Sequence, residues 1–314
     1  MSDHPPPGSP PRPPFGLRLK IQQSPGSPEK SQPNPGFDLL EGYRLEPLAD
    51  VHTNTSGLRK AGVYYIKRPD GSTEGIRKYL HFSNRRARNT YMIPEIQNYR
   101  YISSHPGYHN YVLPILRTSE PTLEMTDFYI DFPYINGVDL FKYLTEIYDA
   151  KKSSGTDMKD EYTQRLLSSI FADVAKSIIF LHSIGVRHND IKLDNIFVVL
   201  RQDSSFIKAV LFDFDVSEII STHSPAIVGA DYKDYIQLFE DNLTLYCGIP
   251  LPAGVPKEVA NIEQEKAVLN DIIVYLRGGA AVANMEGGKR HYSKSKKTRT
   301  RPYPKTLKVA PRKP

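Results

Sequence analysis

The chain has 314 residues, of which 39% are hydrophobic and 24% are charged, a composition that favours one large core or two small lobes. No apolar run reaches the roughly 18 residues that a membrane-spanning helix needs, and the single Cys247 excludes an intrachain disulfide. Together with a proline-studded N-terminus unlike a signal peptide, these features predict an intracellular protein, cytoplasmic or nuclear, without membrane contact.

Proline is concentrated near the start of the chain. Eleven of the 26 prolines fall within residues 1–36, where Gly and Ser separate them. Such a segment cannot bury enough apolar surface to offset the entropy that it would lose on ordering. We therefore predict a disordered Pro-rich tail at 1–36 with local polyproline II character.

Charge is segregated as well. Residues 289–314 contain eleven Lys or Arg and no acidic residue, and residues 1–36 carry a net +2. Because the whole chain carries +6, the remaining residues 37–288 carry −7. We predict a disordered basic tail at 288–314 that contacts nucleic acid or an acidic partner; a solvated tail without a dedicated partner is the alternative. Its opening Gly-Gly-Lys resembles C-terminal tails on proteins of large DNA viruses, which would imply a location in the host cell or virion.

The first half of the folded region has a strand pattern. "GVYYIKR" (62–68) and "EGIRKYL" (74–80) flank an Asp-Gly pair, which is typical of a hairpin. A helix is expected at 89–104, with Pro94 early, where a missing N–H matters least. Two more strands are predicted, at 111–118 and 127–135.

The second half has a helical pattern. Apolar spacings of three and four predict helices at 139–149 and 162–185, and Gly185 is a typical residue after a helix end. Two strands around "QDSS" follow, and then helices at 234–246 and 258–277. A strand-rich half followed by a helix-rich half predicts an α+β fold with two lobes.

Four polar residues are crowded between the long helix and the first of those two strands. In "GVRHNDIKLDNIFVV", Asp190 follows His188 by two positions, Lys192 follows Asp190 by two, and Asn195 opens the strand. Asp213 ends the partner strand, so its carboxylate and the Asn195 amide would lie side by side and suit Mg²⁺. A base, a cation and a metal clamp are what phosphoryl transfer needs. A polar turn with capping residues is the alternative.

These motifs resemble the eukaryotic-type protein kinase superfamily, from about Gly57 to Asp234. "HNDIKLDN" resembles the catalytic loop His-Arg-Asp-x-Lys-x-x-Asn, and "LFDFD" resembles the strand-end Asp-Phe-Gly. The resemblance implies a bilobal fold with an N-lobe at 37–132 and a minimal helical C-lobe at 133–287. It also implies ATP and Mg²⁺ as cofactors. The roles implied are catalytic base for Asp190, contact with the transferred phosphate for Lys192, and metal binding for Asn195 and Asp213.

The same resemblance implies nucleotide-binding residues in the N-lobe. Lys78 occupies the place of the phosphate-binding lysine, and Glu95, seventeen residues later, would be its ion-pair partner. Lys67 is the rival lysine, but no glutamate lies at a comparable distance beyond it. Gly57 and Gly62 keep the outer spacing of the glycine-rich loop.

A further match lies at the connection between the lobes. "PYINGVDLFKYL" resembles the hinge and the helix after it. By this match the Pro133 carbonyl and the Ile135 N–H would pair with adenine, and Asp139 would meet the ribose.

Several residues depart from the family pattern. Arg59 replaces the middle glycine of the loop, and Ile76 adds bulk over the expected adenine site. Asn189 replaces the catalytic-loop arginine, and Asp215 replaces the glycine after Asp-Phe. The arginine normally pairs with a phosphorylated activation loop, so its absence predicts no such switch.

The interval after Asp213 is short, and this widens the choice of function. Only twenty residues separate it from Asp234, the aspartate expected in the central C-lobe helix, with no Ala-Pro-Glu between them. The platform that grips a peptide is therefore short or missing. Three functions follow: a serine/threonine protein kinase, favoured by Lys192; a pseudokinase scaffold; and a phosphotransferase for a small substrate. We predict the first, because all the catalytic residues named above are retained.

Overall fold

The computed structural model describes residues 35–36, 38–48, 59–82, 93–120, 126–220 and 229–278. The chain divides into two compact units, 1–32 and 33–314. The first unit lies wholly outside the described residues, so the fold below is that of the second. The disorder predicted at 1–36 and 288–314 also falls outside them, apart from Pro35 and Gly36.

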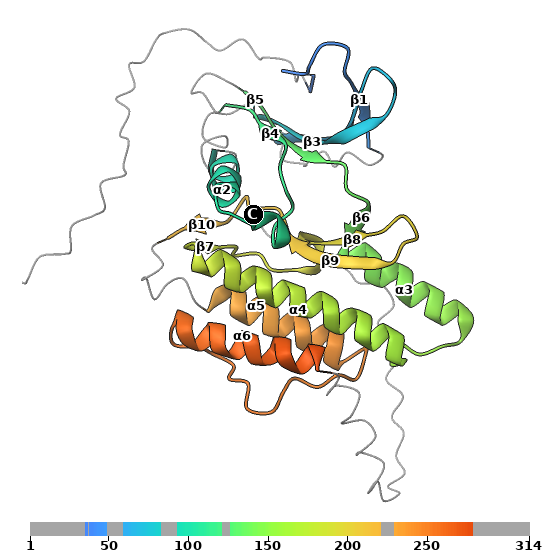
Figure 1. Cartoon of the computed structure of the whole chain (residues 1–314), viewed down its shortest axis with the longest axis vertical. Helices are drawn as coiled ribbons and strands as arrows, with labels where there is room; N and C mark the ends of the chain where they lie inside the picture. Colours follow the sequence, from blue (N-terminus) through green and yellow to red (C-terminus); the bar gives the residue numbers. More distant parts are fainter. Residues whose placement is uncertain are drawn as a thin grey trace, which may run out of the picture. The chain divides into compact units, whose positions relative to one another are not determined.

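An antiparallel sheet opens the fold, with the strand order β1-β2-β3-β5-β4 (Figure 1). Its strands are β1 (Arg44–Pro47), β2 (Arg59–Lys67), β3 (Thr73–Phe82), β4 (Arg117–Thr118) and β5 (Asp127–Pro133). The hairpin predicted between β2 and β3 is present. Its turn is held by Asp70, whose Oδ1 accepts a hydrogen bond from the Ser72 N–H at 2.8 Å, and Gly71 supplies a positive φ of 87°.

The strand predicted at 111–118 is wrong for most of its length, since only Arg117 and Thr118 belong to β4. Pro114 has no N–H to give to a ladder. The residues before it bond to another strand instead: the Leu113 N–H donates to the Leu211 carbonyl, and the Leu211 N–H donates to the Tyr111 carbonyl, both at 2.9 Å. This stretch therefore ties the first half of the fold to the second.

Successive side chains along β3 and β5 point to opposite faces of the sheet, and the two faces differ in composition. One face buries apolar residues against helix α2 (Ile93–Ser103), and these residues form part of the main core. They include Leu80, Phe128, Ile130 and Tyr99. The other face buries an ion pair, in which Arg77 Nε lies 2.7 Å from Asp131 Oδ1 with both side chains fully covered.

The described residues of the second half form two small sheets and four α-helices. The strands are β6 (Gly137–Asp139), β7 (Val186–Arg187), β8 (Ile196–Leu200), β9 (Phe206–Leu211) and β10 (Glu218–Ile219). The helices are α3 (Leu140–Ser154), α4 (Glu161–Ser183), α5 (Ala230–Phe239) and α6 (Ile262–Arg277). Helix α4 packs against α5 and α6, as Figure 1 shows. The predicted α+β fold, with an antiparallel sheet followed by helices, is confirmed.

Helix α4 is the central core helix. Asp160 caps its N-terminus by accepting from the Thr163 N–H at 3.1 Å, and Gly185, just beyond its end, has a φ of 76°. Although no run of the sequence was expected to be long and apolar enough to cross a membrane, α4 is so by length and composition, and 67% of its most apolar window is buried inside the fold. That burial is what a core helix shows.

Candidate active site

The segment between β7 and β8 gathers three of the expected site residues around one carboxylate. Asp190 Oδ2 accepts hydrogen bonds from Lys192 Nζ at 2.5 Å and from Asn195 Nδ2 at 2.9 Å. Asn195 Nδ2 also donates to the Asp190 carbonyl at 2.9 Å. A short 3₁₀ turn, Leu193–Asn195, brings the amide back over the aspartate. Because the amide nitrogen is bound to Asp190, the amide oxygen is the atom that Asn195 offers to a cation.

A second cluster forms around Lys78. Its Nζ lies 2.6 Å from Glu95 Oε1 on α2 and 2.6 Å from Asp213 Oδ1 beyond β9. The rival Lys67 lies elsewhere, with its Nζ 2.7 Å from Thr73 Oγ1 and 3.6 Å from Glu46. The structure therefore brings Lys78, and not Lys67, to the glutamate and the strand-end aspartate.

Burial and the neighbouring charges shift the pKa values of Lys78 and Glu95. Burial opposes the positive charge of Lys78, but the carboxylates of Glu95 and Asp213 outweigh it and raise the pKa of the ammonium above its ordinary value. Burial also raises the pKa of Glu95, against the attraction of Lys78. Lys78 is thus held as a cation between the carboxylates of Glu95 and Asp213.

Asp213 adopts an unusual backbone conformation. Its φ is 67°, in the left-handed region that few residues other than Gly, Asn and Asp enter. The Asp213 N–H donates to the Tyr99 hydroxyl at 3.0 Å, which holds the strained residue against α2. Such strain is often found at functional sites.

The two clusters are joined at the strand ends. The Phe212 N–H donates to the Asn195 carbonyl at 3.1 Å, and His188 Nε2 donates to the Phe212 carbonyl at 3.0 Å. Asn195 and Asp213 therefore lie on neighbouring chain segments, as expected for residues at the adjacent ends of two paired strands.

This donor set fits Mg²⁺. Within the described ranges, no group of three or more His, Cys, Asp or Glu side chains gathers as a metal site of its own. Mg²⁺ that acts on nucleotides uses few protein oxygens, because the phosphates and water supply the other ligands. A carboxylate from Asp213 and an amide oxygen from Asn195 match that pattern.

The residues expected to contact the base and ribose lie in the connection between β5 of the first sheet and helix α3. Pro133 ends β5 opposite Gly75, and the next N–H, from Tyr134, donates to the Glu74 carbonyl at 3.0 Å. Ile135 follows before β6 begins. Asp139 caps α3 by accepting from the Lys142 N–H at 2.7 Å, so it has a structural role beside the one expected.

Of the two loop glycines, one is described. Gly62 is buried in β2 opposite Tyr79. A Cβ at Gly62 would come within 2.5 Å of the Tyr64 ring, so a side chain there would force that ring to move. Gly57 lies outside the described residues.

The aspartate expected at Asp234, in the central C-lobe helix, is not the one that supports the loop between β7 and β8. Asp231, not Asp234, is fully buried beneath the catalytic loop. Its two carboxylate oxygens accept the N–H groups of His188 and Asn189, each at 2.7 Å. Spacing along the helix does not distinguish the two acids; only the packing of α5 under the loop does.

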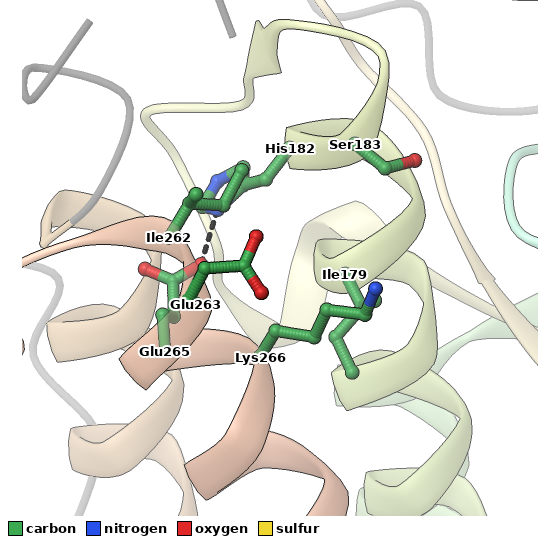
Figure 2. Close-up of a pocket in the computed structure, with 7 residues that line it drawn as sticks. All are labelled: Ile179, His182, Ser183, Ile262, Glu263, Glu265 and Lys266. Carbon is green, nitrogen blue, oxygen red and sulfur yellow. Dashed lines mark hydrogen bonds and ion pairs between the residues drawn. The ribbon is translucent and has the colours of Figure 1, made fainter. Parts of the chain in front are cut away.

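His182 completes this buried support, and sequence reasoning missed it. Its Nε2 lies 2.9 Å from Asp231 Oδ2, and its Nδ1 contacts Glu265 of α6. Burial opposes protonation of the imidazole, but the two carboxylates raise its pKa to about 9. Figure 2 shows His182 and Glu265 joined in this way. They line a pocket of about 240 Å³ between α4 and α6. His182 bonds to Asp231, the acid that holds the catalytic loop. We therefore assign His182 a structural role.

Aromatic rings pack in edge-to-face and tilted pairs between the two clusters. Phe214 contacts Tyr99 of α2 with ring centroids 5.0 Å apart and His188 of the catalytic loop with centroids 4.8 Å apart. Tyr99 also contacts Phe132 at the end of β5. Nothing in the spacing of these residues along the chain indicates that Tyr99 meets these partners.

Comparison with known proteins gives one family. The family model described as "Protein kinase domain" matches residues 60–236. Calcium-dependent protein kinases 10 and 14 of Arabidopsis thaliana are each 25% identical over 132 residues, and calcium-dependent protein kinase 7 is 24% identical over the same length. Each match covers 38% of this chain and 24% of the relative, so the chain matches about a quarter of the length of these relatives.

The family match spans more than half of the chain and includes the whole of both clusters. The mixed fold, with an antiparallel sheet followed by helices, agrees with it. The chain belongs to the protein kinase domain family.

Proposed function

We propose that this protein transfers the γ-phosphoryl group of ATP, with Mg²⁺, to serine or threonine hydroxyls of a protein substrate. The observation that carries the proposal is the position of Lys78, whose Nζ contacts carboxylates from two distant segments, Glu95 and Asp213. A chain that served only as a scaffold would not need to keep a partly buried lysine against the fully buried Glu95, because such charges are costly to bury.

Each role follows from a contact in the site. Lys78, held by Glu95, meets the α- and β-phosphates of the nucleotide. Asp190, held by Asn195, orients the attacking hydroxyl and accepts its proton. Lys192, bonded to Asp190 in this structure, turns to the moving phosphoryl group and neutralises its charge.

The metal would be held by Asp213 and the amide oxygen of Asn195. When bound, Mg²⁺ neutralises charge on the phosphate oxygens. The Pro133 carbonyl and the Ile135 N–H would pair with the adenine and Asp139 would meet the ribose. Gly57 and Gly62 would cover the phosphates.

A nucleotide-free scaffold is the second candidate, and Ile76 favours it. Ile76 lies on β3 directly opposite Phe132 of β5, and its branched side chain adds bulk where the adenine would lie. Thermal shift with and without Mg·ATP tests this point. A rise in melting temperature supports nucleotide binding, and no rise at millimolar Mg·ATP supports the scaffold.

The short interval between Asp213 and Asp231 favours a third candidate, transfer to a small substrate. Proteins and small polyols offered side by side distinguish the two acceptor classes. The basic residues 289–314 remain a proposed contact for nucleic acid or an acidic partner, which a salt-dependent binding assay tests.

The main experiment is transfer from radiolabelled ATP to a basic protein, with Asp190→Asn as the matched variant. We expect the wild-type chain to label the substrate and Asp190→Asn to lose at least about 100-fold in rate. Equal labelling by both proteins would mean a contaminating kinase. Bound Mg·ATP without Asp190-dependent labelling would favour the scaffold.

A further inference from the structure

A buried amide on α2 holds the loop that follows Asp213. Asn98 is only 3% exposed, and its Nδ2 donates to the Phe214 carbonyl at 3.1 Å and to the Ser217 carbonyl at 2.8 Å. Both hydrogens of one amide therefore bind the two ends of a tight loop. Removing them would leave two carbonyls without these donors, and a buried polar group without a partner is costly.

A second amide, that of Asn189 in the catalytic loop, also bonds to the loop that follows Asp213. Asn189 Nδ2, from the catalytic loop, donates to the Val216 carbonyl at 3.1 Å. Asn189 has a φ of 66°, a conformation that asparagine tolerates better than most residues. Ser217 Oγ also donates to the His188 carbonyl at 3.0 Å. The loop is thus bonded to α2 on one side and to the catalytic loop on the other.

The chain stays anchored beyond the loop. Strand β10 pairs with β7, and the Ile220 N–H donates to the Gly185 carbonyl at 2.7 Å. The cation in this region, Arg187, is paired with Glu218 at 2.7 Å. Residues 213–220 are therefore held by backbone pairing, by hydroxyl and amide hydrogen bonds, and by an internal ion pair.

Asn98 also couples this loop to the lysine cluster. It lies three residues after Glu95, so both side chains project from one face of α2. One side chain holds Lys78 and the other holds the loop that carries Asp213. A shift of α2 would disturb both sets of contacts together.

We propose that Asn98 is a positioning residue which, with Asn189, holds Asp213 in its catalytic arrangement without phosphorylation of the segment after it. This inference rests on the proposed phosphoryl transfer. Segments ordered by phosphorylation gain their order from new arginine–phosphate pairs. Here an asparagine occupies the arginine position and donates to the segment directly, so the order is built in.

The test compares Asn98→Leu and Asn189→Gly with Arg100→Ala. The leucine keeps the volume of Asn98 but has no donor, and the glycine removes the Asn189 amide while accepting the positive φ. Arg100→Ala is the control, because it removes side-chain hydrogen bonds of the same helix to Thr118 and Glu120, away from the loop. We expect kcat to fall about tenfold or more in Asn98→Leu, with the KM for ATP within about twofold, and a smaller fall in Asn189→Gly.

Two further measurements test the inference without relying on the kcat of the variants alone. Hydrogen exchange of amides 214–220 in the full chain should accelerate in Asn98→Leu and stay at the wild-type rate in Arg100→Ala. Wild-type protein treated with a protein phosphatase, and shown by mass spectrometry to carry no phosphate between Asp213 and Asp231, should keep its kcat within about twofold.

The outcomes separate the two claims. Unchanged loop exchange and unchanged kcat in Asn98→Leu, or loss of wild-type activity on dephosphorylation, would overturn the inference while leaving phosphoryl transfer intact. A wild-type chain without Asp190-dependent transfer would overturn the proposed function, and the inference with it. If Asn98→Leu does not fold, Asn189→Gly and the phosphatase comparison still decide.

Discussion

The Lys78 Nζ lies 2.6 Å from Asp213 Oδ1, although 135 positions separate the two residues in the chain. This contact joins the first sheet to the loop after β9. It also places a cation beside the carboxylate that is proposed to hold the metal. Substitution at Lys78 should therefore affect chemistry and stability together.

Lys78→Met should reduce phosphoryl transfer by at least about 100-fold, because the phosphate contact is lost. It should also lower the free energy of unfolding by about 3–5 kcal/mol, since Glu95 is left buried without its cation. Lys67→Met is the matched control on the neighbouring strand and should leave the rate near wild type. Initial rates and urea unfolding measure the two effects. Equal loss in both variants would contradict the assignment of Lys78.

The buried His182 predicts a pH-dependent stability. Burial works against its protonation, but its hydrogen bonds to Asp231 and Glu265 raise the folded-state pKa from 6.5 to about 9. The stabilisation is therefore complete below about pH 6.5 and is lost as the pH rises through about 9. We expect the difference in unfolding free energy between wild type and His182→Gln to shrink by about 2–3 kcal/mol from pH 6 to pH 9.5. A difference that is independent of pH would show that His182 does not bind its proton this tightly.

Asp231 and Asp234 offer a matched pair on one helix. Asp231→Asn should cost about 2–4 kcal/mol of stability, because it weakens the bonds to the N–H groups of the catalytic loop and to His182. It should also slow transfer, since Asp190 follows those N–H groups directly. Asp234→Asn, at a half-buried position, should have the smaller effect on both. Thermal melts and initial rates decide, and the reverse order would restore Asp234 as the central acid.

The ion pair on the far face of the sheet is a stability element. Arg77 and Asp131 are both fully covered, and Arg117 adds a second contact to Asp131 at 2.6 Å. Arg77→Leu should lower the free energy of unfolding by about 2–4 kcal/mol, since Arg117 compensates only part of the buried charge. Arg44→Ala, which removes an exposed pair with Glu46, should cost less than about 1 kcal/mol. Urea unfolding compares them, and equal costs would mean that the buried pair adds no net stability.

Some elements of the fold were predictable from the sequence and others were not. The β2–β3 hairpin and the ends of α4 were predictable, because the turn and capping residues act on neighbours in the chain. The strand at 111–118 was not, because apolar alternation does not reveal that Pro114 interrupts pairing or that its neighbours bond to β9. Helix α6 begins at Ile262 rather than Glu258, because Asn261 caps it.

The residues of the candidate site also differ in how far the sequence predicts them. Asp190, Lys192 and Asn195 lie within six positions, so the sequence alone placed them on one short segment. Asn98, His182 and Asp231 carry no such signal. Their partners are 42 to 119 positions away, and a lone Asn, His or Asp in a helix has many possible roles.

The sequence by itself determined the family motifs, the β2–β3 hairpin, the long helix α4 and the residues of the catalytic loop. These depend on contacts between neighbours, whose geometry the backbone fixes over a few residues. Only the tertiary structure decided that Lys78 meets Asp213, that Asp231 supports the loop and that Asn98 holds the segment beyond it. Those contacts form when distant elements pack around a common core, and packing selects among acids and amides that look alike along the chain.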